Sequence, residues 1–387
     1  MRAPDQHHFP PVRFAALRRA LAADPERYAG SRNFLDGAVT ALSPYLVHGY
    51  LGEAELFALW RARHGLTLDD RLGSELAWRC FFRQVRRHAG EAIFSDLRPG
   101  LPVAYAAALP ADLVEARTGV PVIDASVRRL YETGYLHNHQ RLWLASYTVH
   151  LRKVHWRAGA DWMHGHLLDG DPASNHLSWQ WVAGTFSSKP YLFNAENVAR
   201  YAPALASPGT AIDTGYATLE AIARGAADVG AEPGVHAGTP PPPYHAQPPG
   251  HANPALPACD GRSVALVHPW ALGRRPPGEF VLGVVHAPAH AALPWSARRW
   301  NFVLAGMRAC CDAIWAGDLG EIAPALRRAR RLRADAAPLP GYLDALGATP
   351  EIRVPERALP EVAPPLASFS AYLRQLRRLE PGLFRRP

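Results

Sequence analysis

The sequence predicts a multidomain α and α/β protein: an all-helical domain over residues 1–230, a proline-rich linker over 231–262 and a small Rossmann-like α/β domain over 263–387. Apolar residues in the first part recur at helical spacing, and strand-like alternation is scarce there. A cluster of prolines and glycines then interrupts the pattern, and the short apolar runs that follow it are typical of buried strands. These three observations define the expected fold class.

Several segments of the first part are expected to be helices, because apolar residues recur in them every three or four positions. They are Arg13–Leu21, Leu51–Trp60, Ser74–Arg87, Val122–Thr133, Leu136–Val154 and Trp162–Leu168. One more helix is expected after Gly170, since Asp171 is a good N-cap and Pro172 costs nothing at the first helical position. The prediction is an all-helical domain with a central cleft.

The last part of the chain is expected to be a small parallel α/β domain. Val264–Val267 and Phe280–Val285 have the composition of buried strands, and Ser296 is placed to begin a helix. Ile352–Val354 is a candidate further strand and Phe369–Leu376 a candidate closing helix. The order strand, strand, helix, strand favours a parallel sheet.

The composition favours a globular protein of two or three domains, since 48% of its 387 residues are hydrophobic. No stretch has the apolar length of a transmembrane helix, and the first residues lack the apolar core of a signal peptide. We therefore expect a cytoplasmic protein without membrane association, and a monomer. The cysteines fit neither a disulfide framework nor a metal site, so free thiols and no metal are expected; they are Cys80, Cys259, Cys310 and Cys311.

The formal net charge of +8 would suit a polyanionic partner such as nucleic acid. The same basicity also fits codon bias, because Lys153 and Lys189 are the only lysines in a chain rich in Arg, Ala and Pro. Charge alone therefore permits nucleic-acid binding without establishing it.

Chemistry concentrates in Asp169–Trp181, which has the sequence DGDPASNHLSWQW. Asn175 and Trp179 lie four residues apart and so share one face of the expected helix. An amide and an indole beside a helix start with two carboxylates suit a flat polar ring. The same residues equally fit a capped core helix whose Trp is packing.

This pattern closely resembles the flavin-binding core of the photolyase/cryptochrome family. Five further blocks resemble segments of that family: Tyr28–Asn33, Thr40–Leu46, Glu75–Phe82, Gly119–Ala125 and Thr133–Leu142. The family's spacing is kept from Gly119 to Trp181. The resemblance implies an all-helical domain that binds FAD.

The resemblance also implies which residues hold FAD: Tyr28, Arg32, Thr40, Leu42, Ser43, Arg79, Asn138, Arg141, Asp169, Asp171 and Asn175. Hydroxyls and backbone N–H groups at a helix start have the right chemistry for the pyrophosphate. Arg141 is expected to pair with Asp169 along the flavin edge, and Asn175 to face flavin N5. Val39 and Ala41 replace residues usual in the family, so thinner phosphate contacts are expected.

By the same resemblance, a flipped-out pyrimidine dimer would bind at Glu75, Trp78, Leu142 and Trp181. Cys80 replaces the family's second Glu in this region, so part of that site is expected to differ from the family.

The resemblance further makes Trp179 the first electron donor to the flavin and Trp156 the next. Trp179, Trp156, Asn175 and Glu75 are the expected catalytic residues. Val103 stands where the family has its outer Trp, and Tyr105 is the nearest aromatic residue. An altered exit for the electron path is therefore expected.

The domain order departs from the family, in which an antenna-type α/β domain ordinarily precedes the flavin domain. Segments resembling that domain instead follow here, in the family's order: Val264–Val267, Phe280–Val285, Pro294–Arg299 and Ala367–Tyr372. The resemblance implies a rearranged photolyase with this domain at the C-terminal side, and leaves open whether a second, antenna chromophore binds.

The function expected from this resemblance is a light-driven, FAD-dependent DNA photolyase that acts on UV-damaged DNA and splits cyclobutane pyrimidine dimers. The alternative is a cryptochrome-like flavin photoreceptor that signals to a partner. Glu75, Trp78 and Trp181 favour repair, whereas Cys80, Leu142 and the missing outer Trp favour sensing. A third hypothesis is a degenerate flavin fold that serves only as an interaction module.

Overall fold

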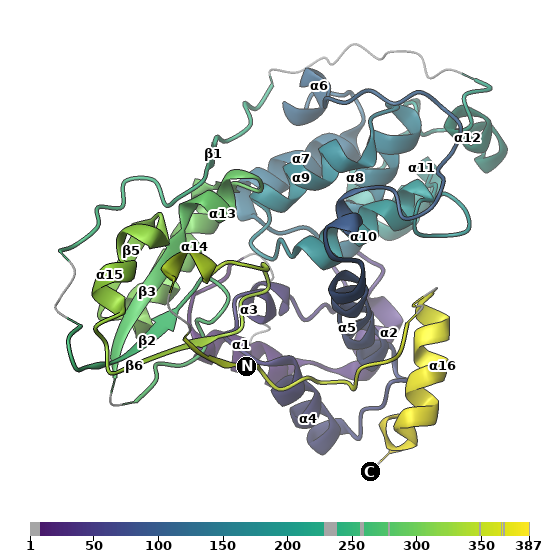
Figure 1. Ribbon diagram of the computed structural model, residues 1–387. Coiled ribbons are helices and arrows are strands. Elements are labelled where there is room, and N and C mark those ends of the chain that lie inside the picture. Colours follow the sequence, from purple (N-terminus) through teal and green to yellow (C-terminus); the bar gives the residue numbers. More distant parts are fainter. Residues whose placement is uncertain are drawn as a thin grey trace. The chain divides into compact units, whose positions relative to one another are not determined.

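The computed structural model describes residues 8–227, 238–255, 259–277, 279–347, 350–364, 366 and 368–386 (Figure 1). Backbone contacts divide it into two compact units. The helical unit comprises Asp24–Val39, Trp60–Pro241 and Leu359–Pro387, and the α/β unit comprises Met1–Ala23, Thr40–Leu59 and Pro242–Ala358.

The helical unit is built from helices and short helical turns, without a named strand in its described part. Its longer helices are α2 (Pro25–Ser31), α5 (Arg71–Ala89), α7 (Pro121–Thr133), α8 (Asn138–Ser146), α9 (Trp156–His166), α10 (Pro172–Ala183), α11 (Ala195–Tyr201), α12 (Tyr216–Ala223) and α16 (Phe369–Leu379). Shorter turns are η1 (Gly90–Phe94), α6 (Ala111–Val114), η2 (Tyr147–Leu151), η3 (Pro203–Leu205) and η6 (Pro381–Phe384).

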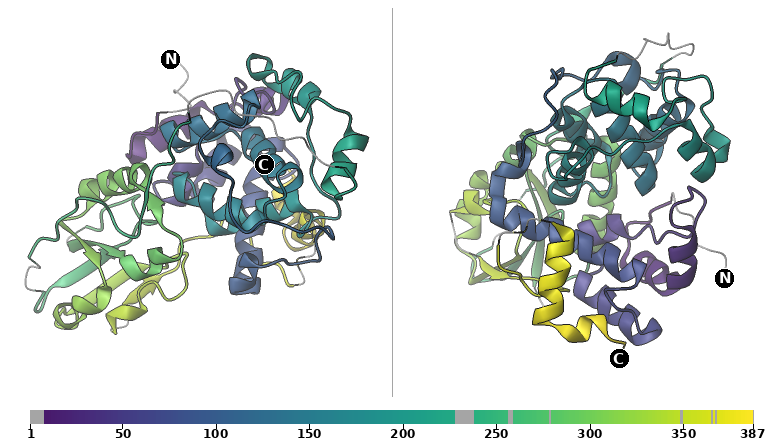
Figure 2. Two further views of the ribbon diagram at one scale, coloured as in Figure 1. Left: turned by 90° about the horizontal axis from the view of Figure 1, so that it is seen from above. Right: turned by 90° about the vertical axis from the view of Figure 1, so that its right-hand side faces the viewer.

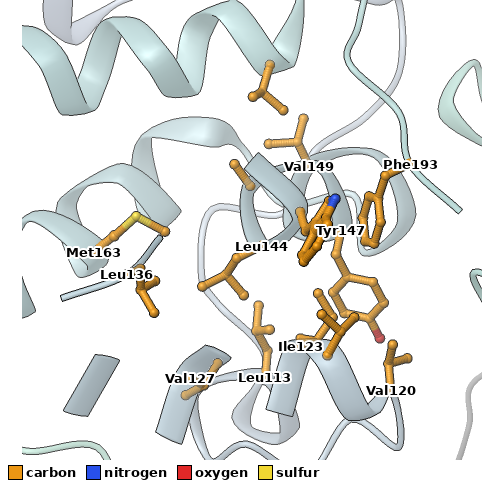
Figure 3. Close-up of a cluster of buried hydrophobic side chains, with 14 of the residues drawn as sticks. Leu113, Val120, Ile123, Val127, Leu136, Leu144, Tyr147, Val149, Met163 and Phe193 are labelled. Carbon is orange, nitrogen blue, oxygen red and sulfur yellow. The ribbon is translucent and has the colours of Figure 1, made fainter. Parts of the chain in front are cut away.

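The core of this unit lies among α7, α8, α9 and α10, which pack on one another. Figure 3 shows part of it, with Ile123 and Val127 of α7 facing Leu144 of α8 and Met163 of α9. These four side chains are at most 1% exposed. Burial of such apolar side chains supplies most of the stability of a helical unit, because isolated helices of this length are marginal in water.

Two helix boundaries differ from the sequence prediction. The helix expected over Leu136–Val154 ends as α8 at Ser146 and closes with the wider turn η2. Lys153 then has a positive φ of 52°, which a helix does not allow. The next helix begins at Trp156 instead of Trp162, because the His155 side chain caps it by accepting from Arg157 N.

The α/β unit contains a parallel sheet, as the sequence predicts, and this sheet has five strands. The strand order is β5-β3-β2-β6-β7, and every adjacent pair is parallel. Its strands are β2 (Ser263–Val267), β3 (Phe280–His286), β5 (Ala313–Gly317), β6 (Arg331–Asp335) and β7 (Glu351–Arg353). Its helices and turns are α1 (Arg13–Ala22), α3 (Ser43–Val47), α13 (Ala287–Ala291), α14 (Ala297–Cys310), η4 (Leu319–Glu321), α15 (Ala323–Leu326) and η5 (Asp344–Leu346), and α4 (Glu53–His64) spans the boundary between the units.

Strands β5 and β6 are absent from the sequence prediction. In β6, exposed Arg331 and half-buried Arg333 alternate with buried Leu332 and Ala334. That period of two is the pattern of a half-buried strand and was the available signal. The predicted helix start at Ser296 is confirmed, since its hydroxyl caps α14.

Part of the proline-rich segment packs more than the sequence suggests. Strand β1 (Tyr244–His245) pairs with β4 (Trp295–Ser296), and Asn253 exchanges two hydrogen bonds of 2.8 Å with the backbone of Ala316. Proline has no N–H to donate to the hydrogen bonds of a sheet. The non-proline residues between the prolines can still pair with a strand at the edge of a sheet. Of the expected linker 231–262, residues 231–237 and 256–258 lie outside the described residues.

The closing helix groups with the helical unit and not with the α/β residues that precede it. Phe369 of α16 stacks on Trp78 of α5 with ring centroids 3.9 Å apart and planes at 14°. Tyr372 packs on Phe81 one turn further along. Figure 2 shows yellow α16 alongside α5. Ala367, at the start of the segment expected here, lies outside the described residues.

None of the described helices combines the length and the hydropathy of a membrane span.

The histidines of the helical unit predict sensitivity to acid. Burial lowers the pKa of His137 and His150 from 6.5 to about 4, and that of His166 to about 3. As pH falls from about 6.5 towards 4, these histidines bind protons in the unfolded chain but stay neutral in the folded one. The free energy of unfolding therefore decreases over that pH range.

Urea unfolding at pH 7.5 and pH 5 measures this effect. We expect His150→Gln to flatten the pH dependence, whereas His88→Gln, a control at an exposed position, should leave it unchanged. Equal pH dependence for His150→Gln and the parent would contradict the assignment.

Candidate functional site

Helix α10 begins as the sequence predicts. Asp171 is its N-cap and accepts from the Ser174 backbone N–H at 3.3 Å and from the Ser174 hydroxyl at 2.8 Å. Pro172 occupies the first helical position, where its missing N–H leaves no bond unmade. This cap fixes the direction in which α10 presents Asn175 and Trp179.

Asn175 is held by a single directed bond. Its Nδ2 donates to the Ala160 carbonyl of α9 at 2.8 Å, and the residue is 8% exposed. Because the nitrogen is engaged, the amide cannot flip without losing that bond. Among the described residues we find no donor to its Oδ1, so the oxygen is left to accept a hydrogen bond from outside the protein.

Trp179 lies directly against the backbone of α9. A Cβ atom added to Gly159 would sit 2.3 Å from the indole ring, which is closer than any real contact. Only glycine therefore permits this approach. Trp179 is 2% exposed, and its position agrees with the predicted face shared with Asn175.

The predicted pairing of Arg141 with Asp169 is confirmed. Arg141 Nη2 lies 3.1 and 2.8 Å from the two carboxylate oxygens, and its Nε donates to the Leu136 carbonyl at 2.9 Å. The Asp169 side chain is 3% exposed, against 25% for Arg141. The guanidinium is thus fixed at one end and reaches the surface at the other.

Asp171 is a buried anion next to three guanidinium groups of α5. Burial alone would raise its pKa, but the charges of Arg83, Arg79 and Arg86 outweigh that cost and lower the pKa to about 2. Arg83 Nε lies 3.8 Å from Asp171 Oδ2. The start of α10 is therefore an electropositive region built around one carboxylate.

Tyr28, Arg32 and Glu75 come together between α2 and α5. Arg32 Nε lies 3.9 Å from Glu75 Oε1, and the Glu75 side chain is 48% exposed. Surrounding protein raises the pKa of Glu75, with Arg32 and Arg71 opposing the shift. Burial, followed by the charge of Glu75, raises the pKa of the Tyr28 hydroxyl. The structure thus brings together three residues that the sequence assigned to cofactor and substrate.

Trp78 and Glu75 both lie on α5, and the role of Trp78 in binding a lesion stays a prediction. Phe369 covers one face of the Trp78 ring. The physical reason is long-range packing of α16, which no local pattern around Trp78 could reveal.

The remaining predicted residues fall into two groups. Thr40, Leu42 and Ser43 belong to the α/β unit, so their joining the other residues stays a prediction. The others lie in the helical unit: Asn138 is exposed as the first residue of α8, Leu142 is half-buried against the core, and half-buried Trp181 packs on Tyr191 at 5.8 Å between ring centroids.

Three residues near Trp156 and Trp179 were missed by the sequence reasoning. The ring of Trp179 lies against the backbone of Gly159. Asp96 accepts a hydrogen bond from the indole N–H of Trp156 at 2.6 Å. Gln180 accepts a hydrogen bond from the backbone N–H of Leu97, the residue after Asp96. The Gln within the Trp-Gln-Trp motif was the one available signal for this group.

Comparison with known proteins bears on this site. Residues 72–212 match the family model described as the FAD binding domain of DNA photolyase. The deoxyribodipyrimidine photo-lyase of Streptomyces griseus is 38% identical over 160 residues, which cover 40% of this chain and 34% of that protein. The deoxyribodipyrimidine photo-lyase of Thermus thermophilus is 37% identical over 175 residues, covering 44% and 41%.

A crystal structure of a class III photolyase from Agrobacterium tumefaciens superposes with a TM-score of 0.44 and 27% identity, over 52% of this chain and 46% of that one. The matched segment thus spans well under half the length of the curated relatives. The sequence matches confirm the family resemblance for this segment: residues 72–212 are similar to the FAD-binding domain of DNA photolyases.

The contact between Gly159 and Trp179 gives a direct test of the site's packing. Gly159→Ala should lower the free energy of unfolding by about 1–3 kcal/mol, because the added methyl group overpacks the helix pair. Gly30→Ala is the matched control, since no atom lies within 4 Å of its added Cβ. We expect the control to be neutral or slightly stabilising.

Urea unfolding measures both variants. Adding Trp179→Phe to Gly159→Ala should recover part of the loss, because the smaller ring leaves space. A Gly159→Ala variant as stable as the parent would show that the ring does not lie on this backbone.

Proposed function

We propose that this protein is a light-driven, FAD-dependent DNA photolyase that splits cyclobutane pyrimidine dimers. The match of residues 72–212 to the FAD binding domain of DNA photolyase supports the cofactor and the reaction class. The structural observation that carries the proposal is the fixed Asn175 amide, whose oxygen stays available on the helix that Asp171 caps.

These residues fit a flavin. Asn175 offers an acceptor oriented by Ala160, which suits an N–H group at the middle of a tricyclic ring. Arg141, held in place by Asp169, offers N–H donors to an electronegative edge. Tyr28, Arg32, Arg79 and Asn138 would extend the contacts along FAD, and the hydroxyls of Thr40 and Ser43 with the backbone of Leu42 would bind its phosphates.

Bound FAD in its reduced state supplies the electron that splits the dimer, while the protein supplies position and electrostatics. Asn175 would hold its amide oxygen towards the flavin N–H. Trp179, seated on Gly159, fills the space beside it and would keep water out. The buried charges of Asp169 and Asp171 are compensated before any cofactor binds, so they need no rearrangement.

A flipped-out dimer would be bound by Glu75 and Trp78 of α5, with Trp181 and Leu142 completing the pocket. Glu75 presents a half-exposed carboxylate that accepts hydrogen bonds from the polar edge of the bases. The dimer would stack on Trp78, either next to Phe369 or in its place. The net charge of +8 suits the DNA backbone.

The alternative function is a cryptochrome-like photoreceptor. One observation favours it: Phe369 already occupies a face of the ring on which the lesion would stack. A protein that senses light without repair has no need to keep that surface open.

For the α/β unit we propose the role of an antenna-type domain that follows the flavin domain. The order β5-β3-β2-β6-β7 reverses direction at β2, so a crevice is expected between the carboxyl ends of β2 and β6. Buried His268, which bonds the Asp335 carbonyl at 3.1 Å, lies at that point.

A repair assay tests the main proposal. Chemically reduced protein is mixed with an oligonucleotide that contains one cyclobutane thymine dimer, in light and in darkness. We expect dimers to disappear only in light. FAD-containing protein that leaves all dimers intact in light would favour the photoreceptor.

The proposed lesion site predicts selective losses of affinity. Glu75→Gln should weaken dimer-containing DNA by about tenfold or more and leave undamaged DNA nearly unaffected, since a hydrogen bond to a charged group contributes about 1.5–3 kcal/mol. Trp78→Ala should act in the same direction.

Glu132→Gln, at an exposed position on α7, is the matched control and should change neither affinity. Competition binding with the two DNAs makes the measurement. Equal losses on both would show that this face does not recognise the lesion.

A further inference from the structure

The indole N–H of Trp156 points at a carboxylate that links it to solvent. Trp156 is 2% exposed, and its Nε1 donates to Asp96 Oδ1 at 2.6 Å. The Asp96 side chain is 43% exposed. A buried ring proton therefore has a single short bond to a group that water can reach.

Three further bonds hold the loop that carries Asp96. Buried Gln180 donates from Nε2 to the Ile93 carbonyl at 2.8 Å and accepts from the Leu97 N–H at 3.0 Å. Arg157 donates to the Phe94 carbonyl at 3.0 Å. Bonds on both sides of Asp96 fix its position, and Gln180 belongs to the same helix as Trp179.

We propose that Asp96 is the proton acceptor of Trp156 during light-driven reduction of the flavin. This inference rests on the proposed function. One electron passes from Trp179 to the excited oxidised flavin, and one electron then passes from Trp156 to Trp179. The Nε1–H bond of oxidised Trp156 breaks, its proton binds Asp96 Oδ1, and a neutral indolyl radical remains. A thiol in solution later returns one electron and one proton to that radical and becomes a thiyl radical, and Asp96 releases its proton to water.

The proton transfer has a physical purpose in this chain. Removing an electron from an indole makes its N–H strongly acidic, and losing the proton makes the return of the electron less favourable. Val103 stands where an outer Trp was expected, so the charge cannot move outward onto another indole at that position. Moving the proton instead traps the oxidised state at Trp156.

A neighbouring route competes with this one. The His155 ring lies 5.5 Å from that of Trp156, and the Tyr105 ring lies 6.2 Å from His155. His155 Nε2 is also 3.7 Å from Asp96 Oδ1. An electron leaving through Tyr105 would make a tyrosyl radical, whereas proton transfer to Asp96 leaves a neutral indolyl radical, so the two routes differ spectroscopically.

Asp96→Asn is the decisive variant, because an amide oxygen still accepts the N–H but does not take up its proton. Transient absorption of FAD-containing protein distinguishes the cationic and neutral indole radicals. We expect the parent to form the neutral radical, and Asp96→Asn to retain the cation and lose it at least tenfold faster. Asp36→Asn, at an exposed position of the same unit, is the control and should match the parent.

A readout on the flavin-free protein checks the hydrogen bond itself. With ¹⁵N-labelled tryptophan, the indole N–H resonance of Trp156 should shift upfield in Asp96→Ala and much less in Asp96→Asn. An unchanged resonance in Asp96→Ala would overturn the contact.

The failures are distinguishable. A neutral indolyl radical formed by Asp96→Asn at the parental rate, or a tyrosyl radical that Tyr105→Phe removes, would overturn the role of Asp96 while leaving flavin binding intact. Chemically reduced Asp96→Asn should repair dimers like the parent. A parent protein that takes up no FAD would overturn both proposals.

Discussion

The candidate site depends on the close approach of α9 and α10. Gly159 lets the ring of Trp179 lie on the backbone of α9, and Asn175 reaches the Ala160 carbonyl only because the two helices are that close. One missing side chain thus sets the position of both functional residues. The same helix pair carries Trp156 at the start of α9 and Gln180 on α10, so the proposed electron path and the proposed proton acceptor are positioned together.

Two buried carboxylates flank the start of α10. Arginine side chains neutralise their charges, and this pairing decides what the site can bind. Asp169 is paired with Arg141, and Asp171 lies next to the guanidinium groups of α5. Breaking a buried pair by removing one partner costs about 3–5 kcal/mol, because an uncompensated charge remains. The arrangement therefore fixes these charged groups without help from a ligand, which is the preorganisation that a flavin site needs.

Much of this local design could be predicted from the sequence, because it depends on short-range chemistry. Asp171 and Pro172 define the helix start, and the spacing between Asn175 and Trp179 places both on one face. The pair of Arg141 and Asp169 followed from family resemblance. Long-range packing could not be predicted: Phe369 reaches Trp78 from the far end of the chain, and Asp96 reaches Trp156 from a loop without a periodic pattern. The end of the helix before Lys153 could not be predicted either, because the residue type of a lysine does not indicate a positive φ.

The central claim is that α9 and α10, with their flanking carboxylates, hold a flavin. The most direct measurement is the FAD content of the purified full chain, by absorption and by release on denaturation, followed by titration of flavin-free protein with FAD. The account predicts non-covalent FAD that approaches one per chain after reconstitution, and a large loss of uptake in Asp169→Asn compared with the Asp36→Asn control. Correctly folded protein that stays colourless and takes up no FAD would contradict it.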